Sequence, residues 1–204
     1  MFRLNATDKD GQPIAFVVPI PGTTKRPRLR YPTDKEWCDR VHALKIVRTS
    51  LGRDKSQSDV PGQAAADLAL YERIRKDDTV VDPAEASFVI DLIDRNRIAS
   101  VEQEGERYRI TLEGLGFSVS HLVRIPLQSE SSEYEARSLK PVFGKRSTEL
   151  LPALEPAGVL YDRVIVESSG YAGSVPITHK HAVIRELLDQ VDALVSDNGI
   201  ELPE

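Results

Sequence analysis

The residues of this chain that could do chemistry are its four histidines, its single cysteine and a loop with two glycines. His179 and His181 flank Lys180 at the start of the predicted last helix. Side chains two residues apart on a helix point about 200° away from each other, so these two imidazoles do not converge on one metal ion. The other two, His42 and His121, belong to separate predicted elements, and a zinc site needs three or four ligands. The spacing therefore predicts no metal site, and we interpret His179 and His181 as capping, surface or interface residues.

The loop with two glycines, Gly-Tyr-Ala-Gly-Ser at residues 170–174, has part of the composition of an anion-binding loop. A phosphate-binding fingerprint follows a strand and requires fuller glycine spacing or a Lys-Ser/Thr pair. Here the preceding residues, 157–167, are predicted to be helical. We therefore interpret the loop as a helix terminator and turn, in which an exposed Tyr171 could contact another protein.

Catalytic nucleophiles and cofactor motifs are not recognisable in the sequence. Cys38 adjoins Trp37 in a charged stretch, no Gly-x-Ser-x-Gly elbow is present, and the 32 acidic residues contain no pair that stands out. We predict no catalytic residue and no cofactor, and hence a non-enzymatic protein. The alternative is an enzyme whose acidic site forms only in space.

The distribution of charge indicates a second kind of site. Residues 25–55 hold ten Lys or Arg against four Asp or Glu, a net charge of +6, and the remaining residues carry −11, which together give the chain's −5. Such a basic segment can contact nucleic acid or an acidic partner. Against nucleic acid, no recognised binding motif is present, and Asp34, Glu36 and Asp39 lie on the same predicted helix. The candidate phosphate contacts are Arg26, Arg28, Arg30, Arg40, Lys45 and Arg48.

The N-terminal residues are expected to form a β arm. Residues 2–6 and 14–18 alternate in polarity around a turn at residues 8–11, which predicts a hairpin. Residues 19–27 are too rich in proline for regular structure and read as an extended linker. A lone hairpin is marginally stable, so we expect it to dock on the body or on another subunit.

Three helices are predicted next. Thr33 and Glu36 fit a capping box at the start of a first helix that ends near residues 51–52. A polar loop at residues 56–62 precedes a second helix at residues 64–76. A third helix has proline at its first position, and its expected buried face contains Phe88, Val89, Leu92 and Ile93.

From residue 99 onward the apolar spacing changes from helical to alternating, which predicts antiparallel hairpins that turn at Gly105 and around residues 114–116. A capping box at residues 132–135 predicts a short helix, and residues 141–156 give no clear signal. The chain then closes with two helices on either side of the 170–174 loop. The last helix has the spacing of one buried face, formed by Ile184, Leu188, Val191 and Val195.

Together these patterns predict an α+β fold: an N-terminal β-hairpin arm, a small helical section, an antiparallel sheet and a C-terminal helical pair. The expected domain organisation is a hairpin and proline-rich basic arm at residues 1–31, three helices at residues 32–98, and hairpins followed by helices at residues 99–204. No run approaches the roughly 18 apolar residues that would span a bilayer.

Two stretches resemble parts of a known class of protein. Residues 160–194, LYDRVIVESSGYAGSVPITHKHAVIRELLDQVDAL, are similar to C-terminal regions of conserved proteins encoded among the tail genes of bacteriophages and prophages. Residues 31–53, YPTDKEWCDRVHALKIVRTSLGR, are similar to an early helical portion of the same kind of protein. The resemblance implies a tail assembly factor or chaperone, or a small structural subunit, and it implies no particular site residues.

The expected partners are therefore phage tail proteins or a second copy of the chain, in the cytoplasm of a bacterial host or in the virion, with no membrane contact. An acidic body would discourage nonspecific adhesion to nucleic acid, although a nucleic-acid-binding regulator that uses residues 25–55 is the alternative. The candidate protein-binding residues are Phe16, Val18, Tyr171, Leu188 and Val191.

Overall fold

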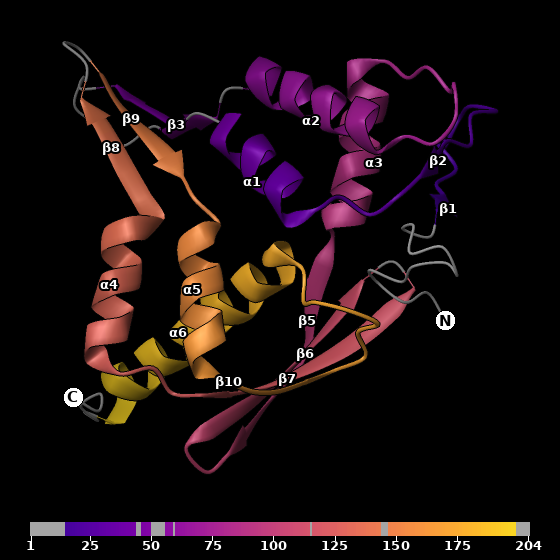
Figure 1. The fold of residues 1–204 in the computed structure, drawn as a ribbon. Coiled ribbons are helices and arrows are strands. Elements are labelled where there is room, and N and C mark those ends of the chain that lie inside the picture. Colours follow the sequence, from indigo (N-terminus) through magenta and orange to yellow (C-terminus); the bar gives the residue numbers. More distant parts are fainter. Residues whose placement is uncertain are drawn as a thin grey trace. The chain divides into compact units, whose positions relative to one another are not determined.

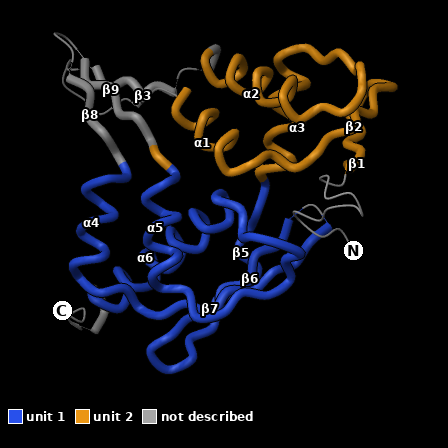
Figure 2. Tube along the Cα trace, in the orientation of Figure 1, with its two compact units in different colours: residues 1–6, 95–138, 154–204 blue, residues 7–94, 139–153 orange. Residues whose placement is uncertain are grey.

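The computed structural model describes residues 15–43, 46–49, 56–58, 60–114, 116–143 and 147–198. Within these ranges it has six helices and ten strands, and the strands pair antiparallel, which confirms the α+β fold. None of the described helices is long and apolar enough to cross a membrane. The chain divides into two compact units (Figure 2): unit 1 comprises residues 1–6, 95–138 and 154–204, and unit 2 comprises residues 7–94 and 139–153.

Helix α1 (Asp34–Ala43) of unit 2 begins at the capping box that the sequence predicts. The Glu36 amide donates to Thr33 Oγ1 at 3.3 Å, and the Thr33 amide donates to the Glu36 carboxylate at 2.9 Å. The predicted end of this helix near residues 51–52 is wrong, because residues 46–49 form strand β3 (Ile46–Thr49). Three of the four residues in β3 are β-branched, and such side chains favour extended structure.

Helices α2 (Val60–Ile74) and α3 (Pro83–Asp94) confirm the second and third predicted helices. Helix α3 begins with another capping box, in which the Glu85 amide donates to Asp82 Oδ1 at 2.8 Å. Its buried face is rotated from the predicted one, because Phe88 is 38% exposed and Leu92 is half-buried. The buried residues of α3 are Ala86, Val89, Ile90 and Ile93.

Short strands complete unit 2. Strand β1 (Phe16–Val17) pairs with β2 (Arg28–Leu29), which lies just beyond the predicted linker at residues 19–27. Residues 2–6, the predicted partner strand, lie outside the described residues.

A second sheet in unit 2 has the order β4-β3-β9-β8. Strands β4 (Ser56–Ser58), β8 (Leu139–Phe143) and β9 (Ser147–Pro152) lie where the sequence predicts a polar loop or gives no clear signal. Their pairing joins residues that are far apart in the chain, which local spacing does not reveal.

Unit 1 contains a four-stranded sheet with the order β10-β7-β6-β5. Strands β5 (Asn96–Glu104), β6 (Arg107–Gly114) and β7 (Phe117–Arg124) form the two predicted hairpins. Gly105 and Gly116 have φ values of 65° and 69°, which glycine adopts most readily, so the predicted turn positions are confirmed. Alternate residues of β6 and β7 are buried, so one face of this sheet forms part of the core.

Helix α6 (Ile177–Asn198) packs against β5 and β6 of this sheet (Figure 1). Helix α5 (Glu155–Val164) packs against α6, and α4 (Gln128–Ser138) packs against α5. Helix α4 begins four residues before the predicted capping box. Helix α5 ends at Val164, because strand β10 (Ile165–Ser169) takes the residues predicted to be its last turn. The β10 residues satisfy their backbone groups by pairing with β7.

Candidate functional site

Four side chains with polar ring atoms or hydroxyls meet inside unit 1: His121, Tyr161, Tyr171 and His179, which we call the Tyr–His cluster. They come from strand β7, helix α5, the loop at residues 170–176 and helix α6. His121 takes one of the inward alternate positions of β7, and His179 lies in the first turn of α6. The sheet and the helix that covers it therefore bring the two imidazoles together.

The cluster is one continuous chain of hydrogen bonds. The Tyr161 hydroxyl lies 2.8 Å from His121 Nδ1. The Tyr171 hydroxyl lies 2.9 Å from His121 Nε2 and 2.8 Å from His179 Nδ1. One tyrosine hydroxyl thus bridges two histidines from different elements.

The protons of the cluster can be arranged in two complete patterns. A neutral imidazole has one N–H donor and one acceptor nitrogen, and a hydroxyl can donate once and accept as well. In the first pattern Tyr161 donates to His121, His121 donates to Tyr171, and Tyr171 donates to His179. In the second pattern all three bonds are reversed. Either pattern satisfies every bond between the four side chains while both histidines are neutral.

Burial keeps the two histidines neutral. His121 and His179 are 0% and 1% exposed. Burial lowers the pKa of His121 to about 4 and that of His179 to about 3, and the neighbouring His121 contributes to the lowering at His179. Burial also raises the pKa of Tyr161. The cluster is therefore an uncharged polar network at neutral pH.

These positions correct two expectations from the sequence. His179 is not a surface residue, and the loop residue Tyr171 is half-buried rather than exposed. His181 is also half-buried, and burial lowers its pKa. Among the described residues, no group of three or more His, Cys, Asp or Glu side chains could hold a metal ion.

Part of the basic segment at residues 25–55 is neutralised by ion pairs inside unit 2. The Arg30 guanidinium donates to both oxygens of the Glu36 carboxylate at 2.6 and 2.7 Å. Arg26 and Arg28 have exposed side chains. Lys45 lies outside the described residues, and Arg48 lies in β3, where only the backbone is described. The structure therefore does not assemble the six basic residues into one described surface.

Arg40, another of these candidates, is part of a buried ion-pair group. Its Nε atom donates to Asp67 Oδ1 at 2.6 Å, its Nη1 atom lies 3.4 Å from Asp94 Oδ2, and its guanidinium lies 5.6 Å from the centre of the Trp37 ring. Asp67 is 1% exposed, and its Oδ2 atom has no hydrogen-bond partner among the described residues. Arg40 thus neutralises carboxylates from α2 and α3 and is not available to phosphate.

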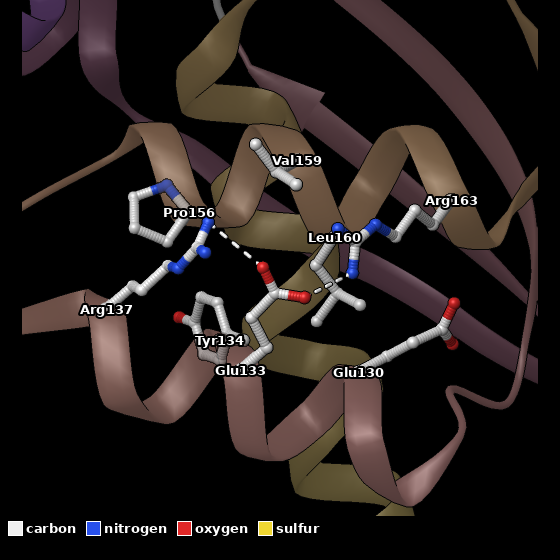
Figure 3. Close-up of a pocket in the computed structure, with 8 residues that line it drawn as sticks. All are labelled: Glu130, Glu133, Tyr134, Arg137, Pro156, Val159, Leu160 and Arg163. Atoms are coloured by element: carbon white, nitrogen blue, oxygen red, sulfur yellow. Dashed lines mark hydrogen bonds and ion pairs between the residues drawn. The ribbon is translucent and has the colours of Figure 1, made fainter.

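A shallow groove lies between α4 and α5 (Figure 3). Glu133 in this groove pairs with Arg163 at 2.7 Å and with Arg137 at 3.0 Å (Figure 3). Glu130 pairs with Arg124 at 2.8 Å. These charges neutralise one another, and the Glu133–Arg163 pair joins α4 to α5, so the groove does not attract a charged ligand. The groove is lined by Glu130, Glu133, Tyr134, Arg137, Pro156, Val159, Leu160 and Arg163.

The predicted protein-binding residues are distributed over several elements. Val18 and Val191 are buried in the cores of their units. Phe16 in β1 and Leu188 in α6 are half-buried. Instead, unit 1 presents the outer edge of β5 and three exposed valines, Val159, Val166 and Val195.

Comparison with protein families, with curated proteins and with solved structures finds no match to this chain. The evidence for its function therefore comes from its own residues. These combine an internal polar cluster with a strand, β5, at the edge of the described sheet.

Proposed function

We propose that this protein is a non-enzymatic assembly or structural protein whose partners are tail proteins of a tailed-phage-like particle or a second copy of the chain. The observation that carries the proposal is the nine-residue strand β5, which lies at the edge of the described sheet in unit 1. An edge strand has unpaired backbone N–H and C=O groups and can take up a strand from another protein.

The side chains of β5 favour a selective partner over general aggregation. The register of β5 against β6 shifts between Ile98 and Ser100, which leaves Ala99 as an extra residue in a bulge. Arg97 pairs with Glu113 at 2.8 Å across the sheet, so the exposed face of this edge is charged. Bulges and charges are the features by which natural edge strands avoid indiscriminate pairing. A partner strand must therefore match this bulge and these charges.

The assignment to a phage tail depends on the sequence resemblance of residues 31–53 and 160–194. An assembly factor and a structural subunit both bind other tail proteins, but only the subunit remains in the finished particle. Whether this protein is present in purified particles therefore distinguishes the two roles.

The proposal is tested by affinity capture of the tagged chain from a prophage-induced bacterial host in the presence of nuclease. We expect tail tube or tape-measure proteins to be recovered. Absence of tail proteins from the captured material and from purified particles would overturn the assignment. Recovery that depends on nucleic acid and falls steeply with salt would favour the alternative, a nucleic-acid-binding regulator.

A pair of variants tests the role of β5. Ala99→Pro removes a backbone donor and blocks a partner strand, and a bulge on an edge strand is one of the few places in a sheet where proline is tolerated. Ala99→Ser retains the backbone N–H and serves as the control. We expect Ala99→Pro to lose the captured tail proteins while Ala99→Ser retains them, with both variants folded by far-UV circular dichroism. Equal capture by both variants would show that β5 is not the binding edge.

A further inference from the structure

The loop at residues 170–176 is fixed at both ends. Gly170 has φ of 91°, and an added Cβ there would lie 2.9 Å from the Ser118 carbonyl oxygen, so the loop starts in close contact with β7. At the other end the Pro176 carbonyl accepts the amides of His179 and Lys180 at 3.0 Å each, in the first turn of α6. Residues 172–174 between these ends are exposed. Tyr171 is the loop side chain that reaches the two buried histidines.

The hydrogen bonds of Tyr171 depend on the protonation of both histidines. With both neutral, Tyr171 donates to one imidazole and accepts from the other. With one protonated, the bonds can all be retained, but a cation is buried. With both protonated, His121 Nε2 and His179 Nδ1 are both donors, so the Tyr171 hydrogen has no acceptor in the cluster.

A cation in the cluster also lacks a counter-ion among the described residues that face it. His121 faces Tyr161 from α5 and Tyr171 from the loop, and His179 faces Tyr171 and stacks on Phe117 from β7. None of these neighbours carries a negative charge at neutral pH.

Asp162 and Lys180, which adjoin Tyr161 and His179 in the sequence, do not supply one either, because they pair with each other. The Lys180 ammonium lies 5.4 Å from the centre of the Tyr161 ring and holds the Asp162 carboxylate at 2.6 Å. The charge that acts on the neighbouring His181 is the cation of Arg185. A buried charge without a partner is strongly unfavourable, so protonation favours a conformation in which the histidines reach water.

We propose that the loop at residues 170–176 is a proton-controlled latch: Tyr171 holds it closed on neutral His121 and His179, and protonation of these histidines releases it. Because burial lowers the pKa of both histidines, the latch stays closed at neutral pH and opens in acid. Release carries Tyr171 away from the cluster and gives water access to the two imidazoles beside β10.

The test is an NMR titration of the full chain from pH 7.5 to pH 2.5. Long-range ¹H–¹⁵N spectra of the histidine rings report protonation and tautomer, and the amide signals of residues 170–175 report the loop. Far-UV circular dichroism follows global unfolding in the same samples. We expect the loop amides to change together with the ring signals of His121 and His179, at a higher pH than the loss of helix.

Three variants separate the latch from general acid sensitivity. Tyr171→Phe removes the bridging hydroxyl, and we expect the loop amides to show the open state already at pH 7. The double variant His121→Gln and His179→Asn places neutral amides near the positions of Nε2 and Nδ1, and we expect loop opening to shift by at least one pH unit toward acid. His181→Asn removes a histidine from the same helix outside the cluster, and we expect it to titrate like the wild type.

Three results would overturn the latch. One is a loop that changes only when the whole chain unfolds. Another is a Tyr171→Phe loop that stays closed at pH 7. The third is a double variant that opens at the wild-type pH.

Discussion

Among the described residues, unit 1 buries a neutral polar group and unit 2 buries a charged one, and the two groups are stabilised in opposite ways. The Tyr–His cluster of unit 1 is neutral and is satisfied by a chain of hydrogen bonds. The group around Arg40 in unit 2 is charged and is held by ion pairs to Asp67 and Asp94. A neutral network is damaged by gaining a charge, whereas a buried ion pair is damaged by losing one partner. The two units should therefore respond differently to mutation and to acid.

The largest effect is expected from Arg40→Ala. The substitution leaves the Asp67 carboxylate buried without a counter-ion, and breaking a buried pair costs about 3–5 kcal/mol of unfolding free energy. Urea unfolding followed by the fluorescence of Trp37, the single tryptophan, reports this directly because Trp37 lies beside Arg40.

Two variants serve as controls for Arg40→Ala. Arg73→Ala breaks an exposed pair with Asp39 and should cost about 0–1 kcal/mol. Replacing both Arg40 by Met and Asp67 by Leu should recover most of the loss, because apolar side chains of similar volume need no counter-ion. A loss for Arg40→Ala as small as that for Arg73→Ala would contradict the buried ion pair.

Acid should destabilise the cluster before it affects the capping box of α1. The ordinary histidine pKa is 6.5, and the folded values are about 4 for His121 and about 3 for His179. The unfolded chain therefore binds more protons in this range, so the stabilisation is complete above pH 6.5 and is lost as the pH falls toward these folded values. The loss reaches about 3 kcal/mol for His121 if its full pKa difference is expressed.

Glu36 in unit 2 gives the contrasting pH window. The hydrogen bond from Arg30 is the main cause that lowers the Glu36 pKa from 4.5 to about 2, so its contribution is present above pH 4.5 and is lost below it. Tyrosine near-UV circular dichroism, to which the cluster contributes, and Trp37 fluorescence should therefore change in that order during acidification. This order would be contradicted if the two signals changed at the same pH, both in the wild type and in the His121→Gln, His179→Asn double variant.

Tyr161→Phe should have the next largest effect. The substitution keeps the buried ring but leaves His121 Nδ1 without its partner, and an unsatisfied buried group costs about 1–3 kcal/mol. Tyr108→Phe is the matched control, because Tyr108 is buried on the same sheet and lies outside the cluster. Urea unfolding should show a loss of unfolding free energy for Tyr161→Phe and not for Tyr108→Phe.

Local sequence signals predicted much of the fold but could not place the two polar groups. The capping box at Thr33, the proline at the first position of α3 and the turns at Gly105 and Gly116 are contained in a few consecutive residues, so they are readable from the sequence. The end of α1, the start of α4 and the strands β8 and β9 depend on pairing or packing with distant residues. At those positions tertiary contacts outweigh local propensity.

The Tyr–His cluster was missed for the same reason. Its members lie up to 58 positions apart, from His121 to His179, and only the sheet and helix packing brings them together. One signal was available: His121 occupies the same alternating face of β7 as Val119 and Val123, which predicts a buried imidazole that needs a hydrogen-bond partner. Local spacing does not identify that partner.

The smallest losses of unfolding free energy are expected from removing the capping side chains of α1 and α3. Asp82→Ala removes an acceptor at 2.8 Å from the Glu85 amide and should cost about 1 kcal/mol. Thr33→Ala removes a longer bond of 3.3 Å, while the Arg30 pair still positions Glu36, so its cost should be about 0.5 kcal/mol. Urea unfolding of both variants measures the difference. A larger loss for Thr33→Ala would show that the Thr33 hydroxyl, and not the Arg30 ion pair, holds Glu36 at the start of α1.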